Sequence, residues 1–316
     1  MKFLKQLFEF APKRRPTSSS ESVGGADSPF NATLKKLRRI EIVSNRMVNE
    51  SFHGQYKSVF RGQGIEFDDV REYVDGDDAR SIDWNVTARA SKPYVKRYVE
   101  ERERTLVIML DLSASNIFGA NVSRLETAAE IAASLMFSAV KNNDKVGLLT
   151  FADGVCEFYP PRKGRKYVLR LLKVALLSRP RQAPTNLGKA LEFVNRTIRG
   201  RAIVFILSDF YFESLDKPLR LCKLRHDVVG VSIEEPLEST LPDLGFVELQ
   251  DPETGVTFDM DTGNQQYRKA ISDRLKMRRD SVIKKFKELK VDLIAVENGG
   301  DYVAPLRNFF RKRERR

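Results

Sequence analysis

The 316-residue sequence contains only two cysteines, two histidines and one tryptophan. Cys156 and Cys222 are too few for a disulfide framework and lack the spacing of a metal motif, which favours a reducing cytoplasm. Neither His53 nor His226 stands at a predicted strand end near a serine, so serine catalysis has no base. There is also no phosphate-binding loop of the GxxxxGK[ST] type. A metal-dependent hydrolase stays open only because bound Mg²⁺ can activate water.

Long hydrophobic runs are also missing, and none approaches the ~20 residues of a membrane span. Hydrophobic residues still make up 41% of the chain, which is enough for a core. The net charge of +12 predicts an anionic partner, and six of the last ten residues are basic. Residues 1–15 carry one apolar helical stripe beside basic residues. This segment fits a helix packed on the protein, with weak binding at the inner face of a membrane as the alternative.

The stretch TLVIMLDLSAS, from Thr105 to Ser115, organises the rest of the chain. Its apolar run predicts a strand buried on both faces. The run ends in a DxSxS pattern, formed by Asp111, Ser113 and Ser115. One carboxylate and two hydroxyls in a tight turn are hard oxygen ligands, of the kind that suits Mg²⁺.

Strands and helices then alternate, which predicts a doubly wound, mostly parallel α/β sheet. The turn at Asp153 and Gly154 is too short for a parallel crossover, so the strand after it should run antiparallel at the sheet edge. Strands are expected at 106–110, 145–151, 155–159, 202–207, 227–233 and 291–296. Helices are expected at 124–141, 165–177, 185–199, 215–224 and 265–289, with a hairpin over 246–260.

Sheet geometry brings separated polar residues together. In the strand order 3-2-1-4-5-6, the first and fourth strands are neighbours, and a crevice opens at their carboxyl ends. Asp111, Ser113 and Ser115 follow the first strand, Asp209 follows the fourth, and Thr185 opens the helix that leads to the fourth. A metal site built from these five residues is therefore predicted, although a capping role is the simpler interpretation of Thr185 or Asp209 alone.

Residues 31–104 have a different character. A helix is expected over 31–50 and a strand over 94–99. Between them lies a cluster of mixed charge around the tryptophan. We favour a salt-bridged module that buries Trp84 and supports this extension against the following domain. A partner-binding surface is the alternative, and a catalytic role for the adjacent acids is disfavoured. The cluster comprises Arg71, Asp77, Asp78, Arg80, Asp83, Trp84 and Arg89.

These segments together resemble the family known as domain of unknown function 58 (DUF58). The matching stretches are GIEFDDVREY at 64–73, GDDARSIDW at 76–84, residues 88–89, 94–96 and 100–103, the DxSxS strand and KVGLL at 145–149. The resemblance implies a von Willebrand factor A-like domain that carries a metal-ion-dependent adhesion site. It also implies a MoxR-type AAA+ ATPase as a partner, and it implies no established activity.

We therefore predict an amphipathic segment and linker over 1–30, a family-specific extension over 31–104, the A-like domain over 105–300 and a basic tail over 301–316. The predicted function is a metal-dependent protein-interaction or adaptor module and not an enzyme. It would bind Mg²⁺, or alternatively Mn²⁺ or Ca²⁺, with a partner carboxylate completing the coordination. The alternative is a basic surface over 265–290 and the tail that binds anionic lipid or nucleic acid, the latter without sequence specificity.

Overall fold

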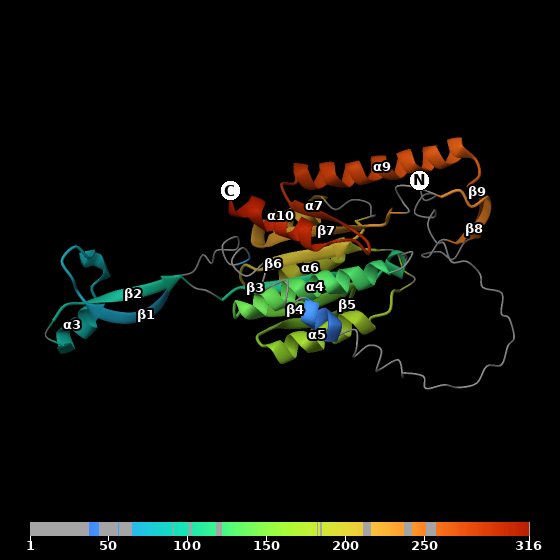
Figure 1. Cartoon of the computed structure of the whole chain (residues 1–316). Helices are drawn as coiled ribbons and strands as arrows, with labels where there is room; N and C mark the ends of the chain where they lie inside the picture. Colours follow the sequence, from blue (N-terminus) through green and yellow to red (C-terminus); the bar gives the residue numbers. More distant parts are fainter. Residues whose placement is uncertain are drawn as a thin grey trace, which may run out of the picture.

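The computed structural model describes residues 38–43, 56, 65–90, 92–100, 103–117, 122–181, 183, 185–210, 216–236, 242–250 and 257–315 (Figure 1). Residues 1–15 and most of the expected helix over 31–50 lie outside these ranges. Within that expected helix, residues 38–43 are helical, and Ile40 is buried in the main core.

A six-stranded sheet forms the centre of the fold, in the order β10-β7-β6-β3-β4-β5. Counted along the chain, this is the predicted order 3-2-1-4-5-6, so the doubly wound, von Willebrand A-like fold is confirmed. All neighbouring pairs are parallel except β4 and β5, which are antiparallel as expected. The strands are β3 (Thr105–Asp111), β4 (Lys145–Phe151), β5 (Val155–Arg162), β6 (Ile203–Ser208), β7 (Asp227–Glu234) and β10 (Asp292–Glu297).

Helices cover both faces of this sheet (Figure 1). On one face lie α4 (Arg124–Lys141), α5 (Arg165–Leu177) and α10 (Val303–Glu314), which pack with Leu106 and Ile108 of β3. On the other lie α6 (Leu187–Thr197), α7 (Asp216–Arg225) and α9 (Gln265–Glu288), which pack with Val107 and Met109. Alternate β3 side chains thus enter opposite layers, which explains the unbroken apolar run.

The residues assigned from sequence to a basic tail form helix α10. Leu306 and Phe310 are buried in the core, while the arginines near the helix end stay at the surface or in ion pairs. Arg313 pairs with Asp227 and Asp292, which ties α10 to the β7 and β10 side of the sheet. The predicted basic tail is therefore a helix that Leu306 and Phe310 anchor to the core.

The extension contains a small antiparallel hairpin of β1 (Ile65–Glu72) and β2 (Tyr94–Glu100), with η3 (Ala79–Ser81) and α3 (Trp84–Ala90) between its strands. These elements lie apart from the six-stranded sheet in Figure 1. Of these four elements, only β2 was predicted from the sequence.

A second hairpin joins β8 (Phe246–Gln250) and β9 (Thr257–Asp261), as predicted, and it precedes the 24-residue helix α9. Phe246 of this hairpin is 82% exposed, whereas Met260 of β9 is buried. Among the helices in the described ranges, none combines the length and the apolar character needed to cross a bilayer.

Gly230 in β7 shows how tightly the second layer is packed. A Cβ at this position would lie 2.6 Å from Phe286 Cε1, 2.9 Å from Leu293 Cδ1 and 3.0 Å from Phe210 Cζ. We expect Gly230→Ala to lower the free energy of unfolding by about 1–3 kcal/mol, because aromatic rings must shift to admit the methyl group. Urea denaturation measures this change. Gly154→Ala, whose Cβ would meet nothing within 4 Å, is the matched control; equal loss in both variants would contradict the packing explanation.

Candidate metal site at the carboxyl edge of the sheet

The turn after β3 gathers the oxygen atoms of the DxSxS pattern. The backbone N–H of Ser113 donates to Asp111 Oδ1 at 2.8 Å, which closes the turn. Ser113 Oγ and Ser115 Oγ lie 2.9 Å apart, and Asn116 Nδ2 donates to Ser113 Oγ at 3.1 Å. Asp111 and Ser113 are buried, and the short helix η4 (Ala114–Ile117) follows directly. The turn therefore converges its side-chain oxygens, as the sequence predicted.

The end of β6 lies beside this turn. Ser208 Oγ donates to Asp111 Oδ2 at 2.6 Å, so a hydrogen bond joins the two strand ends that the topology predicted to be neighbours. The backbone N–H of Phe210 donates to Ser208 Oγ at 3.1 Å. Phe210 has a left-handed backbone with φ of 56°, an uncommon conformation for a bulky residue that occurs at functional sites. The chain thus makes a sharp turn that leaves Asp209 buried at the sheet edge.

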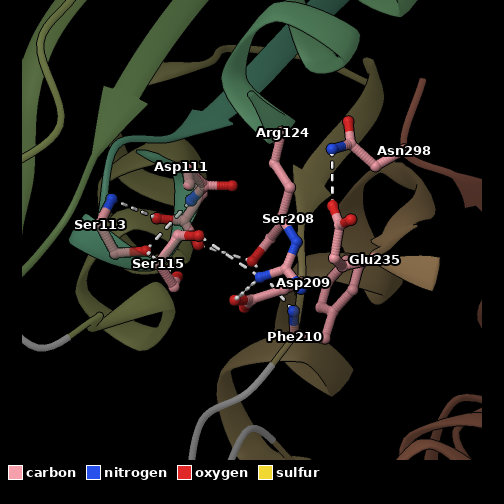
Figure 2. Close-up of polar contacts among 10 residues, drawn as sticks. Asp111, Ser113, Ser115, Arg124, Ser208, Asp209, Phe210, Glu235 and Asn298 are labelled. Atoms are coloured by element: carbon pink, nitrogen blue, oxygen red, sulfur yellow. Dashed lines mark hydrogen bonds and ion pairs between the residues drawn. The ribbon is translucent and has the colours of Figure 1, made fainter. Parts of the chain in front are cut away.

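Arg124, the first residue of α4, is the unexpected member of this site. Its side chain is only 2% exposed, and Nη1 lies 3.4 Å from Asp209 Oδ2 and 3.4 Å from the carbonyl oxygen of Ser115. Figure 2 shows the guanidinium reaching into the group formed by Asp111, Ser208 and Asp209. The first turn of a helix disfavours cations, because its N–H groups already carry positive charge. The carboxylate of Asp209 therefore helps to hold this arginine in place.

Electrostatics within the site act most strongly on Asp111. Burial raises the pKa of this carboxyl to about 7, and the neighbouring charge of Asp209 acts in the same direction. Hydrogen bonds from Ser208 and Ser113 oppose the rise. Two carboxyl groups held close together at a buried edge favour the binding of a cation.

Thr185 lies in the loop that leads to α6, as predicted. The next residue, Asn186, is fixed at the same edge by a 2.6 Å hydrogen bond from its backbone N–H to the carbonyl oxygen of Ala152, just past β4. Earlier in the loop, Arg181 N–H donates to the carbonyl oxygen of Leu112. In the described ranges no hydrogen bond joins Thr185 to Asp111 or Asp209. Its role as a ligand stays a prediction.

Two further strands end in buried polar residues that sequence reasoning missed. Glu235 follows β7 and Asn298 follows β10; Asn298 Nδ2 donates to Glu235 Oε2 at 2.8 Å and to the carbonyl oxygen of Val122 at 2.7 Å. Thr127 Oγ1 of α4 donates to Asn298 Oδ1 at 2.6 Å. A polar residue directly after a buried strand identified Asp111 and Asp209, and the same signal was available for both of these. This network fixes the start of α4, and hence Arg124, against the sheet.

The donor atoms fit a hard divalent cation. They are two carboxylates and the hydroxyls of Ser113 and Ser115, with no sulfur or imidazole. Across the part of the chain that the structure describes, no group of three or more His, Cys, Asp or Glu side chains could hold a metal. A cation here would therefore depend on hydroxyl oxygens and water. The guanidinium of Arg124 is a positive charge at this edge and works against the binding of a cation.

The charged cluster around the tryptophan behaves differently from our preferred interpretation. Trp84 is 69% exposed, so the expectation that it is buried is wrong. Trp84 begins the seven-residue helix α3, which has no buried residue, so its ring has no core to enter. Arg80 and Arg89 are also exposed.

The acids of this cluster stabilise turns instead of forming a shared site. Asp77 receives two hydrogen bonds from Arg71, at 2.6 and 2.7 Å, and this partner holds its pKa below the usual value. Asp78 accepts from the backbone N–H of Arg80, and Asp83 accepts from that of Asn85. The salt-bridged part of the interpretation thus agrees with the structure.

Comparison with known proteins gives a family and a set of similar folds. Residues 69–281 match a family described as protein of unknown function DUF58. An uncharacterized protein of Mycobacterium tuberculosis is 29% identical over 300 residues, which cover 92% of each chain. Among solved structures, an aerotolerance-related membrane protein from Bacteroides fragilis is 18% identical, covers 67% of this chain and 98% of its own, and has a TM-score of 0.44. The VWA domain of SpRpn10 is 15% identical, covers 65% and 94%, and has a TM-score of 0.37.

Proposed function

The chain belongs to the DUF58 family, whose name carries no activity, and we propose from the site geometry that it is a divalent-cation-dependent protein-interaction module. The observation that carries this proposal is the junction of β3 and β6. There Ser208 bonds Asp111, Ser113 and Ser115 bring their hydroxyls together, and Asp209 follows at a buried strand end. Such an edge binds a cation and presents it to a ligand.

In this proposal Asp111, Ser113 and Ser115 hold the ion, and Thr185 and Asp209 hold it directly or through water. Mg²⁺ is the first candidate, with Mn²⁺ or Ca²⁺ as alternatives. The bound ion supplies a Lewis-acidic position that accepts a carboxylate oxygen from a partner. Asp111 anchors the turn through its bond to the Ser113 N–H, and Ser208 orients its second oxygen toward β6.

We infer binding and not catalysis because the described residues place no imidazole near the hydroxyls, and the carboxylate that accepts from Ser208, that of Asp111, is assigned to the cation. His226 precedes β7 and therefore lies at the opposite, amino edge of the sheet. It is also buried, with a pKa lowered to about 4 by burial and by Arg225 and Arg201. A metal-dependent hydrolase would need the cation itself to activate water.

The partner remains part of the proposal. A MoxR-type AAA+ ATPase is the candidate that the family resemblance implies, and an acidic residue on it would reach the cation. Helix α3, which exposes Trp84 and Arg89, is a second contact surface for the same partner, since exposed aromatic and arginine side chains suit protein interfaces. A cytoplasmic location stays a prediction from cysteine content.

A basic surface that binds nucleic acid or anionic lipid is the second candidate. Helix α9 exposes many lysines and arginines, but several are engaged in ion pairs: Arg279 with Glu234, Arg268 with Asp243 and Lys285 with Asp216. Its charges also lie on more than one helical face. Binding of this kind would be weak, independent of sequence and rapidly lost with salt.

Titration calorimetry with Mg²⁺ and Mn²⁺ tests the cation site. We expect the wild-type protein to bind, and Asp111→Ala/Asp209→Ala to lose binding by at least a hundredfold, because both carboxylates disappear. Asp153→Ala is the matched control, since Asp153 is an exposed acid just past β4. Equal binding by wild type and the double variant would contradict the proposal. Pull-down from lysate with Mg²⁺ or with EDTA then tests whether a partner depends on the cation.

A further inference from the structure

Arg124 touches two of the residues that would hold the cation. Its Nη1 lies 3.4 Å from Asp209 Oδ2 and 3.4 Å from the carbonyl oxygen of Ser115, whose hydroxyl belongs to the proposed ligand set. The side chain is 2% exposed and that of Asp209 is 3% exposed, so water screens this charge very little. A divalent cation at this turn would thus have a buried positive charge as its neighbour.

The position of Arg124 is enforced by the fold. Ser123 caps α4 by accepting from the backbone N–H of Glu126, which sets Arg124 as the first helical residue. Just before the helix, the carbonyl oxygen of Val122 accepts a hydrogen bond from Asn298 Nδ2. In the first turn of the helix, Thr127 Oγ1 donates to Asn298 Oδ1. Since the helix start is bound on both sides of Arg124, its backbone is held beside the site, and its buried guanidinium is held there by Asp209 and the carbonyl oxygen of Ser115.

We propose that Arg124 makes cation binding conditional on an anionic ligand. Arg124 and the cation share Asp209, and each lowers the attraction of that carboxylate for the other. The ion alone therefore binds weakly. A carboxylate that arrives on the ion brings the missing negative charge and offsets the repulsion, so cation and acidic partner bind cooperatively. This inference rests on the cation site proposed above and adds its regulation.

The positive charge of Arg124 also explains why the site would not hold a metal ion in the absence of a partner. Without the ion, Arg124 neutralises Asp209 and keeps the buried edge stable. With the ion and no acidic ligand, Arg124 and the ion are like charges that share the carboxylate of Asp209. A carboxylate that binds the ion adds a negative charge beside both of them.

The test compares wild type, Arg124→Gln and Arg124→Lys, which separates the effect of the side-chain charge from that of its size. We expect Arg124→Gln to bind Mn²⁺ alone at least tenfold more tightly than wild type, because the repelling charge is gone. Arg124→Lys keeps the charge and should bind like wild type. Calorimetry gives the dissociation constants. Tighter binding by Arg124→Lys, or equal or weaker binding by Arg124→Gln, would overturn the inference while leaving the cation site itself intact.

A measurement on the unmodified protein covers the case in which a variant does not fold. Mn²⁺ is titrated into wild type in sodium acetate and in sodium chloride of equal ionic strength. We expect several-fold tighter Mn²⁺ binding in acetate, since acetate stands in for the partner carboxylate. Equal affinity in the two salts would overturn the conditional binding. Absence of Mn²⁺ binding in wild type and in both variants, under both salts, would instead reject the cation site, and this inference with it.

Discussion

Phe310→Ala should lower the free energy of unfolding by about 3–5 kcal/mol, the usual loss for a phenylalanine removed from a core. Phe310 is 1% exposed and belongs to the core cluster beneath α4 and α5. Its ring meets that of Tyr56 edge to face, with centroids 6.2 Å apart. Since Tyr56 comes from the extension, the substitution also removes a contact between distant parts of the chain. Chemical denaturation at neutral pH measures the loss.

Arg311→Ala is the control for this experiment, because Arg311 is the next residue on α10 and is exposed. Its effect should stay within about 0.5 kcal/mol. If Phe310→Ala proved as mild as Arg311→Ala, helix α10 would be a surface appendage and not part of the core.

Acid should destabilise the protein through His226. Burial, with the charges of Arg225 and Arg201, lowers its pKa to about 4, whereas an unfolded histidine titrates near 6.5. Between these values the unfolded chain binds a proton that the folded chain refuses. The contribution of neutral His226 is therefore fully present above pH 6.5 and is lost as pH falls toward 4. The expected loss at pH 4 is about 3 kcal/mol.

Urea midpoints from pH 7 to pH 4 for wild type and His226→Asn measure this contribution. The imidazole Nδ1 accepts from the backbone N–H of Ala202 at 3.3 Å, and an asparagine oxygen can replace that acceptor without titrating. The difference between the two proteins is the relevant quantity, because buried acids change stability in the opposite direction. Burial raises the pKa of Asp144 to about 6, so its contribution is lost as pH rises through that value. Parallel curves for the two proteins would contradict the role of His226.

The order of the sheet could be predicted from sequence because each step rests on local patterns. The apolar run of β3 and the short turn at Gly154 fixed the central strand and the antiparallel edge strand. Asp111 and Asp209 followed from the rule for neighbouring strand ends, without any side-chain detail. The bond between Ser208 and Asp111 joins the two strand ends that carry them.

Arg124 could not be placed in this way. It is 85 residues from Asp209 in the chain, and its burial depends on how α4 packs against the sheet. One local signal was present, since a cation directly after the capping Ser123 occupies a helix position that favours acids. The exposure of Trp84 was unpredictable for the opposite reason: a tryptophan is usually buried, and helix α3, which carries it, has no buried residue.

The bond between Ser208 and Asp111 also has a consequence for folding. These residues are 97 positions apart, and their meeting requires β6 to pair with β3 across a long intervening segment. Pairing of this kind closes a long loop and comes late. A partly folded chain in which only β3, α4 and β4 have assembled would contain Asp111 but not the site. A ligand that bridges the two strand ends would then leave the folding rate unchanged and would slow unfolding. Its stabilising effect would appear as a longer lifetime of the folded protein.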